Sequence, residues 1–175
     1  MVVSKVNQFR NIVPLFQYKK FPVGIYRDNL LSDSFSSVKQ ADVVVVLAHP
    51  DDEFFLAGTA ALLAKEGYSV QFVYLTSGNN GPDESKRSLE GTEELFKERE
   101  YELYSALKTL GVTKPPILLR YNDGTTQEAD VSLKIREDLK HILRSTKPRL
   151  VLTFGPDGVY GHPDHIHAGY LTDDI

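Results

Sequence analysis

Short apolar runs alternate along this chain with longer stretches in which apolar residues recur every three or four positions. Four such runs predict strands: 43–48, 69–76, 117–120 and 149–154. The first is rich in β-branched residues and typical of a strand covered on both faces, and the fourth should be buried too. Helical spacing follows the first run and predicts further helices at 92–110, 131–142 and 163–171. Strands that alternate with helices predict an α/β fold with a parallel sheet and right-handed crossovers.

The order of these strands follows from the common doubly wound arrangement. We expect a Rossmann-like sheet of order 3-2-1-4, flanked by helices, in which the first and fourth strands are neighbours. In the helix after the first strand, Phe55, Leu62 and Leu63 should form the buried face, and Gly67 should end it. Arg99 lies on the apolar stripe of the next helix, so we expect it either to pair with a carboxylate or to line a cleft.

Length and composition indicate one domain preceded by an extension. We assign 1–40 to a slightly basic N-terminal extension and 41–175 to the α/β domain. The extension lacks the apolar stretch of a signal peptide, and no window is apolar enough to span a membrane. These features favour a soluble, cytoplasmic protein. They are also compatible with peripheral association with a membrane. The net charge of -4 gives no reason to expect nucleic acid as a partner.

Two short motifs combine imidazole and carboxylate groups: Ala-His-Pro-Asp-Asp-Glu at 48–53 and Gly-His-Pro-Asp-His at 161–165. Each follows a predicted strand, and ligands of parallel sheets lie beyond the carboxyl ends of the strands. Because the first and fourth strands should be adjacent, we expect the two motifs to meet. The chain contains no cysteine, so a metal site must use nitrogen and oxygen ligands.

Together the motifs contain the parts of a catalytic zinc site, which usually has three protein ligands. His49 could be joined by one aspartate of the first motif and one histidine of the second. The remaining carboxylate could accept a proton from water, and the remaining histidine could stabilise an oxyanion, as amide hydrolysis requires. The residues alone do not decide which aspartate is the base.

Simpler structural roles are open to several of these side chains. Asp51 and Asp52 could merely cap a helix, and Glu53 is expected to be a charge in its first turn. His141 and His167 are expected to face solvent on helices. The pairing of two motifs on neighbouring strand ends favours a functional site over these alternatives.

The two motifs, with Tyr160 directly before the second, closely resemble those of the PIG-L/LmbE-like family of zinc-dependent de-N-acetylases. The resemblance runs from about residue 42 to 169 and includes the turns at 76–78 and 123–124. It implies a metal-dependent hydrolase that removes the N-acetyl group from an N-acetylglucosamine-type sugar conjugate, with glycolipids among the candidates.

The resemblance also implies roles for individual residues. Three would be ligands of Zn²⁺, with Fe²⁺ as the alternative: His49, Asp52 and His165. Four others would take part in catalysis. Asp51 would be the general base on the zinc-activated water, His162 would stabilise the oxyanion, Asp164 would orient His162, and Tyr160 would contact the intermediate. Arg99 and Asp123 would contact the sugar.

The sequence departs from the family pattern in two places. Ala57-Gly58 stands where members often carry a Gly-Gly pair, and the sequence ends at Ile175, whereas members generally continue through further strands and helices. We therefore expect 41–175 to be a C-terminally short LmbE-like catalytic domain that lacks these elements. The exposed fourth strand would favour homo-oligomers. The alternative function is a non-catalytic metal- or sugar-binding module, or an inactive truncated member.

Overall fold

The computed structural model describes residues 25–26, 38–81 and 92–175. In this part of the chain five parallel strands form one sheet of order β1-β4-β3-β2-β5: β1 (Ile25–Tyr26), β2 (Val43–Leu47), β3 (Val70–Thr76), β4 (Ile117–Tyr121) and β5 (Leu150–Leu152). The last four strands take the predicted order 3-2-1-4, which confirms the fold class. β1 was not predicted; it comes from the segment assigned to the N-terminal extension, most of which lies outside the described residues.

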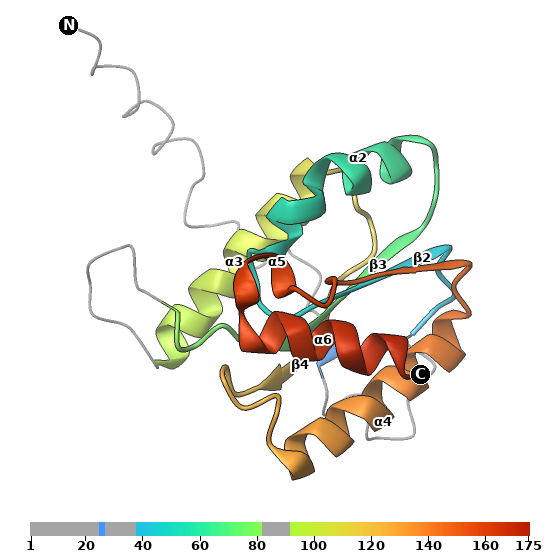
Figure 1. Cartoon of the computed structure of the whole chain (residues 1–175). Coiled ribbons are helices and arrows are strands. Elements are labelled where there is room, and N and C mark those ends of the chain that lie inside the picture. The colour runs from blue at the N-terminus through green and yellow to red at the C-terminus, as the bar shows by residue number, and fades with distance from the viewer. Residues whose placement is uncertain (1–24, 27–37, 82–91) are drawn as a thin grey trace, which may run out of the picture.

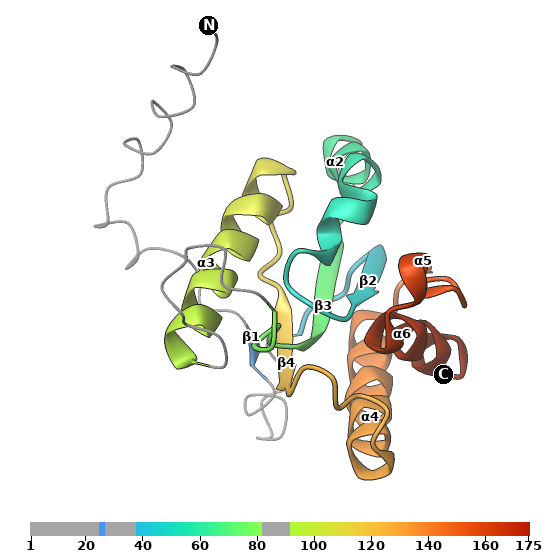
Figure 2. The same cartoon turned by 60° about the vertical axis from the view of Figure 1, so that its left-hand side comes forward.

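Helices cover both faces of this sheet. They are the 3-10 helix η4 (Asp52–Leu56), α2 (Ala57–Lys65), α3 (Glu93–Thr109), α4 (Ala129–Thr146), α5 (Gly158–Gly161) and α6 (Pro163–Asp173). Figures 1 and 2 show α2 and α3 on one face and α4 and α6 on the other. No helix in the described ranges is long and apolar enough to cross a membrane.

The core lies between the sheet and these helices. Every residue of β2 is buried, as its apolar run predicts, and so is every residue of β3, Gln71 and Thr76 included. The prediction that the fourth strand is buried is wrong, because β5 lies at an edge of the described sheet and Leu150 is 45% exposed. On α4, Ile135, Leu139 and Ile142 are fully buried, so the helical stripe read from the sequence is confirmed there.

The predicted buried face of the helix after β2 is wrong. Phe55 is 47% exposed and Leu62 58% exposed, while Ala60 is fully buried and Leu63 is partly buried against the core. The cause is η4, because a 3-10 segment has three residues per turn. The helical phase counted from Phe55 therefore does not continue into α2.

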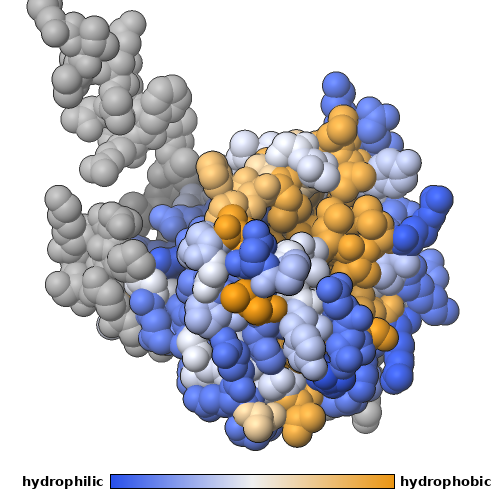
Figure 3. Space-filling view, viewed as in Figure 1, coloured by the Kyte–Doolittle hydropathy of each residue, from blue (hydrophilic) through white to orange (hydrophobic). Residues whose placement is uncertain are grey.

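Apolar side chains also gather on the surface over α2 and beside α5 (Figure 3). The large exposed residues of these and neighbouring elements include Phe54, Phe55, Leu62, Leu150, Val159 and Ile166. Among the described strands β5 pairs only with β2, so it forms one edge of the sheet. Self-association through this edge stays a prediction.

The register of β2 and β5 brings the two motifs together. The strands are parallel, with Val43 opposite Leu150 and Val45 opposite Leu152, so the segments that follow β2 and β5 leave the sheet at the same end. The turn after β4 leaves at this end too. All three segments thus contribute side chains to one site.

Candidate active site

The first motif begins where β2 ends, and its backbone turns sharply at Asp51. Asp51 has a φ of 109°, a left-handed conformation that is uncommon for a residue with a side chain. This turn allows Asp52 to begin η4 directly beneath His49, whose backbone N–H donates to Asp52 Oδ2 at 2.6 Å. Asp51 and Asp52 therefore point to different places, although they are adjacent in sequence.

Three side chains from the two motifs converge on one point. His49 Nδ1 lies 3.4 Å from Asp52 Oδ2 and 3.3 Å from His165 Nε2, and His165 Nε2 lies 3.1 Å from Asp52 Oδ1. All three residues are buried. Tetrahedral zinc has ligand bonds of about 2.0–2.1 Å, which places neighbouring ligands about 3.3 Å apart. The two histidines face different oxygens of Asp52, so the spacing suits an ion only with Asp52 as a carboxylate ligand on that side. Two further groups have one donor atom each within 4.8 Å of one another: His49, His162 and His165, and His49, Asp123 and Asp164.

The far nitrogens of both histidines face acceptors. His49 Nε2 lies 3.0 Å from Asp123 Oδ1 and 3.2 Å from Asp164 Oδ2, and His165 Nδ1 lies 3.2 Å from the carbonyl oxygen of Gly158. Acceptors at these positions place a proton on each far nitrogen. In the neutral rings the lone pairs of His49 Nδ1 and His165 Nε2 then face the convergence point, as in metal-binding histidines.

Carboxylates give this centre an excess of negative charge. Burial opposes a charged imidazole, but the hydrogen-bonded carboxylates of Asp123, Asp164 and Asp52 outweigh it and raise the pKa of His49 to about 11. Burial likewise opposes a charged Asp52, but hydrogen bonds from His165 and His49 hold its pKa at about 2. The geometry and the charge both suit a cation held by nitrogen and oxygen ligands.

Asp164 occupies a different place from the one expected of it. Its Oδ2 accepts hydrogen bonds from His49 and from the backbone N–H of Gly124, and its Oδ1 accepts one from the Thr126 hydroxyl. The carboxylate is thus directed at His49 rather than at His162. His162 instead accepts the backbone N–H of Asp164 at Nδ1, at 3.2 Å, and so caps α6.

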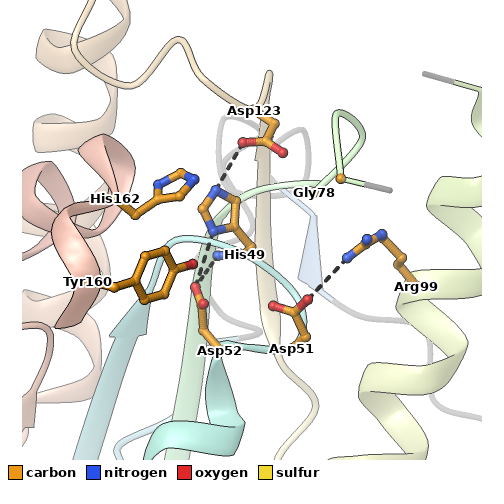
Figure 4. A pocket seen from close by; sticks show the side chains of 9 residues that line it. His49, Asp51, Asp52, Gly78, Arg99, Asp123, Tyr160 and His162 are labelled. Carbon is orange, nitrogen blue, oxygen red and sulfur yellow. Dashed lines mark hydrogen bonds and ion pairs between the residues drawn. The ribbon is translucent and has the colours of Figure 1, made fainter. Parts of the chain in front are cut away.

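A pocket opens beside the convergence point (Figure 4). It is lined by His49, Asp51, Asp52, Gly78, Gly81, Arg99, Asp123, Tyr160 and His162. Tyr160 and His162 approach from one side, and Arg99 approaches from α3 on the other. Every predicted site residue lines this pocket except Asp164 and His165. These two contact the ring of His49, Asp164 at Nε2 and His165 at Nδ1.

Arg99 satisfies both expectations drawn from its position on the helix. Its Nη1 lies 3.3 Å from Asp51 Oδ2, and its side chain lines the pocket while being only 13% exposed. The Asp51 side chain is 72% exposed, so only its inner edge is desolvated; this desolvation and then the charge of Asp52 raise its pKa, against the opposing charge of Arg99. Burial, and then the neighbouring His49 and His165, lower the pKa of His162.

Several residues that support the site were not singled out by the sequence. Asn79 Oδ1 accepts the backbone N–H of Asp123, and Asn80 Nδ2 donates to its carbonyl at 2.7 Å. Thr126 is fully buried against Asp164. Their contacts join segments about 40 residues apart, and nothing in the sequence marks them.

Glu53 also differs from its expected role. It lies in the first turn of η4, but it is buried rather than solvated. Its Oε2 accepts the backbone N–H of Asp51 at 3.1 Å and the hydroxyl of Tyr74 at 3.0 Å. Of the two histidines expected to face solvent, His141 is exposed, which confirms the prediction, whereas His167 is half-buried and contacts Ser132 Oγ at 3.0 Å.

Known proteins share this sequence and architecture. A deacetylase from Catenulispora acidiphila, 1D-myo-inositol 2-acetamido-2-deoxy-alpha-D-glucopyranoside deacetylase 2, is 36% identical over 158 residues, covering 79% of this chain and 51% of that protein. A deacetylase of the same name, without the number, from Rhodococcus opacus is 36% identical over 145 residues, covering 72% of this chain and 50% of that protein. The chain thus spans about half the length of the curated relatives it matches.

Solved structures give the same architecture. N,N'-diacetylchitobiose deacetylase from Pyrococcus horikoshii superposes with a TM-score of 0.63 and is 34% identical, covering 85% of this chain and 54% of that one. GalB from Pseudomonas putida, described as a 4-carboxy-2-hydroxymuconate hydratase, has a TM-score of 0.60 at 28% identity, covering 78% and 55%. The family described as GlcNAc-PI de-N-acetylase, PIG-L, matches residues 44–175. Because this match spans most of the sequence and both motifs, the chain belongs to the PIG-L family.

Proposed function

We propose that this chain carries the site of a metal-dependent amide hydrolase that removes the acetyl group from an N-acetylglucosamine-type sugar conjugate. The observation that carries the proposal is the convergence of His49, Asp52 and His165 beside a pocket that also presents Asp51 and His162. Relatives named as deacetylases of such a conjugate support the choice of substrate class.

The ligands would be His49 Nδ1, Asp52 and His165 Nε2. Two nitrogens and one carboxylate suit zinc, and ferrous iron accepts the same set. When bound, the metal supplies a positive charge that polarises the acetamide carbonyl and lowers the pKa of water.

Asp51 is the proposed general base. Its carboxylate faces the pocket and is not one of the proposed ligands. Its pKa is raised, which makes it a stronger base than an ordinary aspartate. Arg99 pairs with this carboxylate at 3.3 Å, and because its guanidinium lines the pocket it is a proposed contact to the sugar. Asp123 and Tyr160, which also line the pocket, are further proposed contacts to the substrate and to the reaction intermediate.

His162 is the proposed stabiliser of the developing oxyanion. Because its Nδ1 accepts the N–H of Asp164, a neutral ring carries its proton on Nε2. The lowered pKa of His162 favours this neutral form. A hydrogen-bond donor is therefore held at the pocket, where it can bind the oxyanion or protonate the leaving amine.

The test is acetate release from two sugars, 1D-myo-inositol 2-acetamido-2-deoxy-α-D-glucopyranoside and N,N'-diacetylchitobiose, with metal content measured in parallel. We expect about one zinc or iron per chain, retained in Asp51→Asn while turnover falls by orders of magnitude. His165→Ala should lose both metal and turnover, and His141→Ala, which removes an exposed histidine far from the ligands, should lose neither.

Two outcomes would contradict the proposal. Undiminished turnover in Asp51→Asn would remove Asp51 as the base. Stoichiometric metal without acetate release from either sugar would leave a binding module. Because a 28% identical structure is described as a hydratase, addition of water to 4-carboxy-2-hydroxymuconate is the informative counter-assay.

A further inference from the structure

Glu53 and Tyr74 form a buried pair that the proposed reaction does not use. Tyr74, on β3, is fully buried, and Glu53 is 7% exposed. One carboxylate oxygen, Glu53 Oε2, accepts both the Tyr74 hydroxyl and the backbone N–H of Asp51. A buried carboxylate needs such donors, and Glu53 obtains both through one oxygen.

The group that this pair holds is the backbone of the proposed base. Asp51 adopts a φ of 109°, which costs a residue with a Cβ free energy and persists only when its surroundings enforce it. Asp51 also stands at the N-cap of η4, yet its own side chain makes no capping hydrogen bond. Its carboxylate is turned instead to the pocket and to Arg99.

Glu53 makes one half of a capping interaction, since it accepts the backbone N–H of Asp51, the N-cap residue. A glutamate in the first helical turn can reach back to the N–H of the N-cap residue, as in a capping box. Here that contact holds the backbone of Asp51 in the turn from which its side chain reaches the pocket, and the Tyr74 hydroxyl binds the same Glu53 oxygen. The connection runs from β3 through two hydrogen bonds to the residue that faces the substrate.

We propose that Glu53 is a positioning residue for Asp51, with Tyr74 setting the place of its carboxylate oxygen. The inference rests on the proposed function, in which Asp51 is the general base. A purely structural cap would affect stability alone. A positioning role affects the rate of the chemical step, since misplacing a catalytic group by about 1 Å can cost about 100-fold.

The experiment compares Glu53→Met with Glu53→Gln. Methionine fills similar space without a strong acceptor, whereas glutamine keeps an acceptor oxygen. We expect Glu53→Met to lower kcat for acetate release roughly 10- to 100-fold with KM and metal content unchanged, and Glu53→Gln to restore most of the rate. Tyr74→Phe removes only the hydroxyl, so it should give a smaller loss and serves as the second variant if Glu53→Met does not fold.

A matched control comes from a second buried pair of the same chemistry. Tyr121, on β4, donates its hydroxyl to Asp138 Oδ2 on α4 at 2.8 Å, and both residues are buried. Asp138→Leu removes that acceptor from α4, an element that contributes no residue to the pocket lining, so it should lower the melting temperature and leave kcat unchanged. An equal loss of kcat in Asp138→Leu would overturn the proposal.

A readout independent of turnover separates this inference from the proposed function. The amide of Asp51 donates to a carboxylate, so its ¹⁵N–¹H signal should shift upfield and its hydrogen exchange should accelerate in Glu53→Met. If the wild-type chain releases no acetate, the proposed function fails while this signal still tests the contact. An unchanged Asp51 signal, an unchanged kcat, or loss of metal in step with kcat in Glu53→Met would each overturn the positioning role.

Discussion

Replacing Thr126 by valine should weaken metal binding without altering a ligand. The Thr126 hydroxyl donates to Asp164 Oδ1, and the other oxygen of Asp164 holds Nε2 of His49. Thr126 is fully buried and Asp164 is 1% exposed, so water cannot replace the lost donor. Valine keeps the shape of threonine and removes the hydroxyl alone.

The magnitude follows from the length of this connection. A buried hydrogen bond to a charged acceptor contributes about 1.5–3 kcal/mol. Loss of a group that orients a metal ligand usually costs about 10- to 100-fold in affinity. Thr126 acts through two intermediates, Asp164 and His49, so we expect the lower end of that range, about tenfold.

The assay is zinc affinity by competition with a chromophoric chelator, with folding monitored by circular dichroism. Thr146→Val is the matched control, because Thr146 is equally buried but its hydroxyl donates to the carbonyl of Ile142 within α4. An unchanged zinc affinity in a folded Thr126→Val protein, or an equal loss in Thr146→Val, would refute the reasoning.

Two further predictions concern the start of the sheet and the loop beside the pocket. The side chain and backbone N–H of Ser69 lower the pKa of Asp42, so this contact stabilises the fold above pH 3.8 and is lost as the pH falls through the lower native value. Asp42→Asn should therefore lower the melting temperature at pH 7, and the difference from wild type should vanish in strong acid. Gly81→Ala would place a Cβ 2.5 Å from Arg99 Nη2, so KM for the sugar should rise several-fold, whereas Gly58→Ala, with nothing within 4 Å, should leave KM unchanged in the same acetate assay.

The sequence was sufficient for the features that depend on simple periodicity. The apolar run of β2 predicted a buried strand, although the similar run of β5 forms a half-exposed edge, and the usual order of such strands predicted that His49 and His165 would meet. The buried face after β2 was misplaced, because a 3-10 segment changes the helical phase in a way that residue types do not reveal. Periodicity thus predicts layers better than it predicts rotation of a short helix.

Support for the site was harder to predict than its central residues. Thr126 and Asn79 act through hydrogen bonds to side chains and backbone far away in sequence, and each is an ordinary loop residue locally. Glu53 looked like a solvated helix charge because its partner Tyr74 lies 21 residues later on another strand. Such contacts depend on tertiary structure, so local patterns in a single sequence do not predict them.

The parallel pairing of β2 with β5 has a consequence for how the chain folds. His49 and His165 are 116 residues apart, and they can meet only after β5 has docked on the far side of β2. A cation that needs both imidazoles would therefore bind the completed sheet more tightly than partly folded chains. At a free concentration 100 times its dissociation constant, it would stabilise the native state by about 2.7 kcal/mol. The rate of zinc binding during refolding would then measure how fast β5 docks on β2.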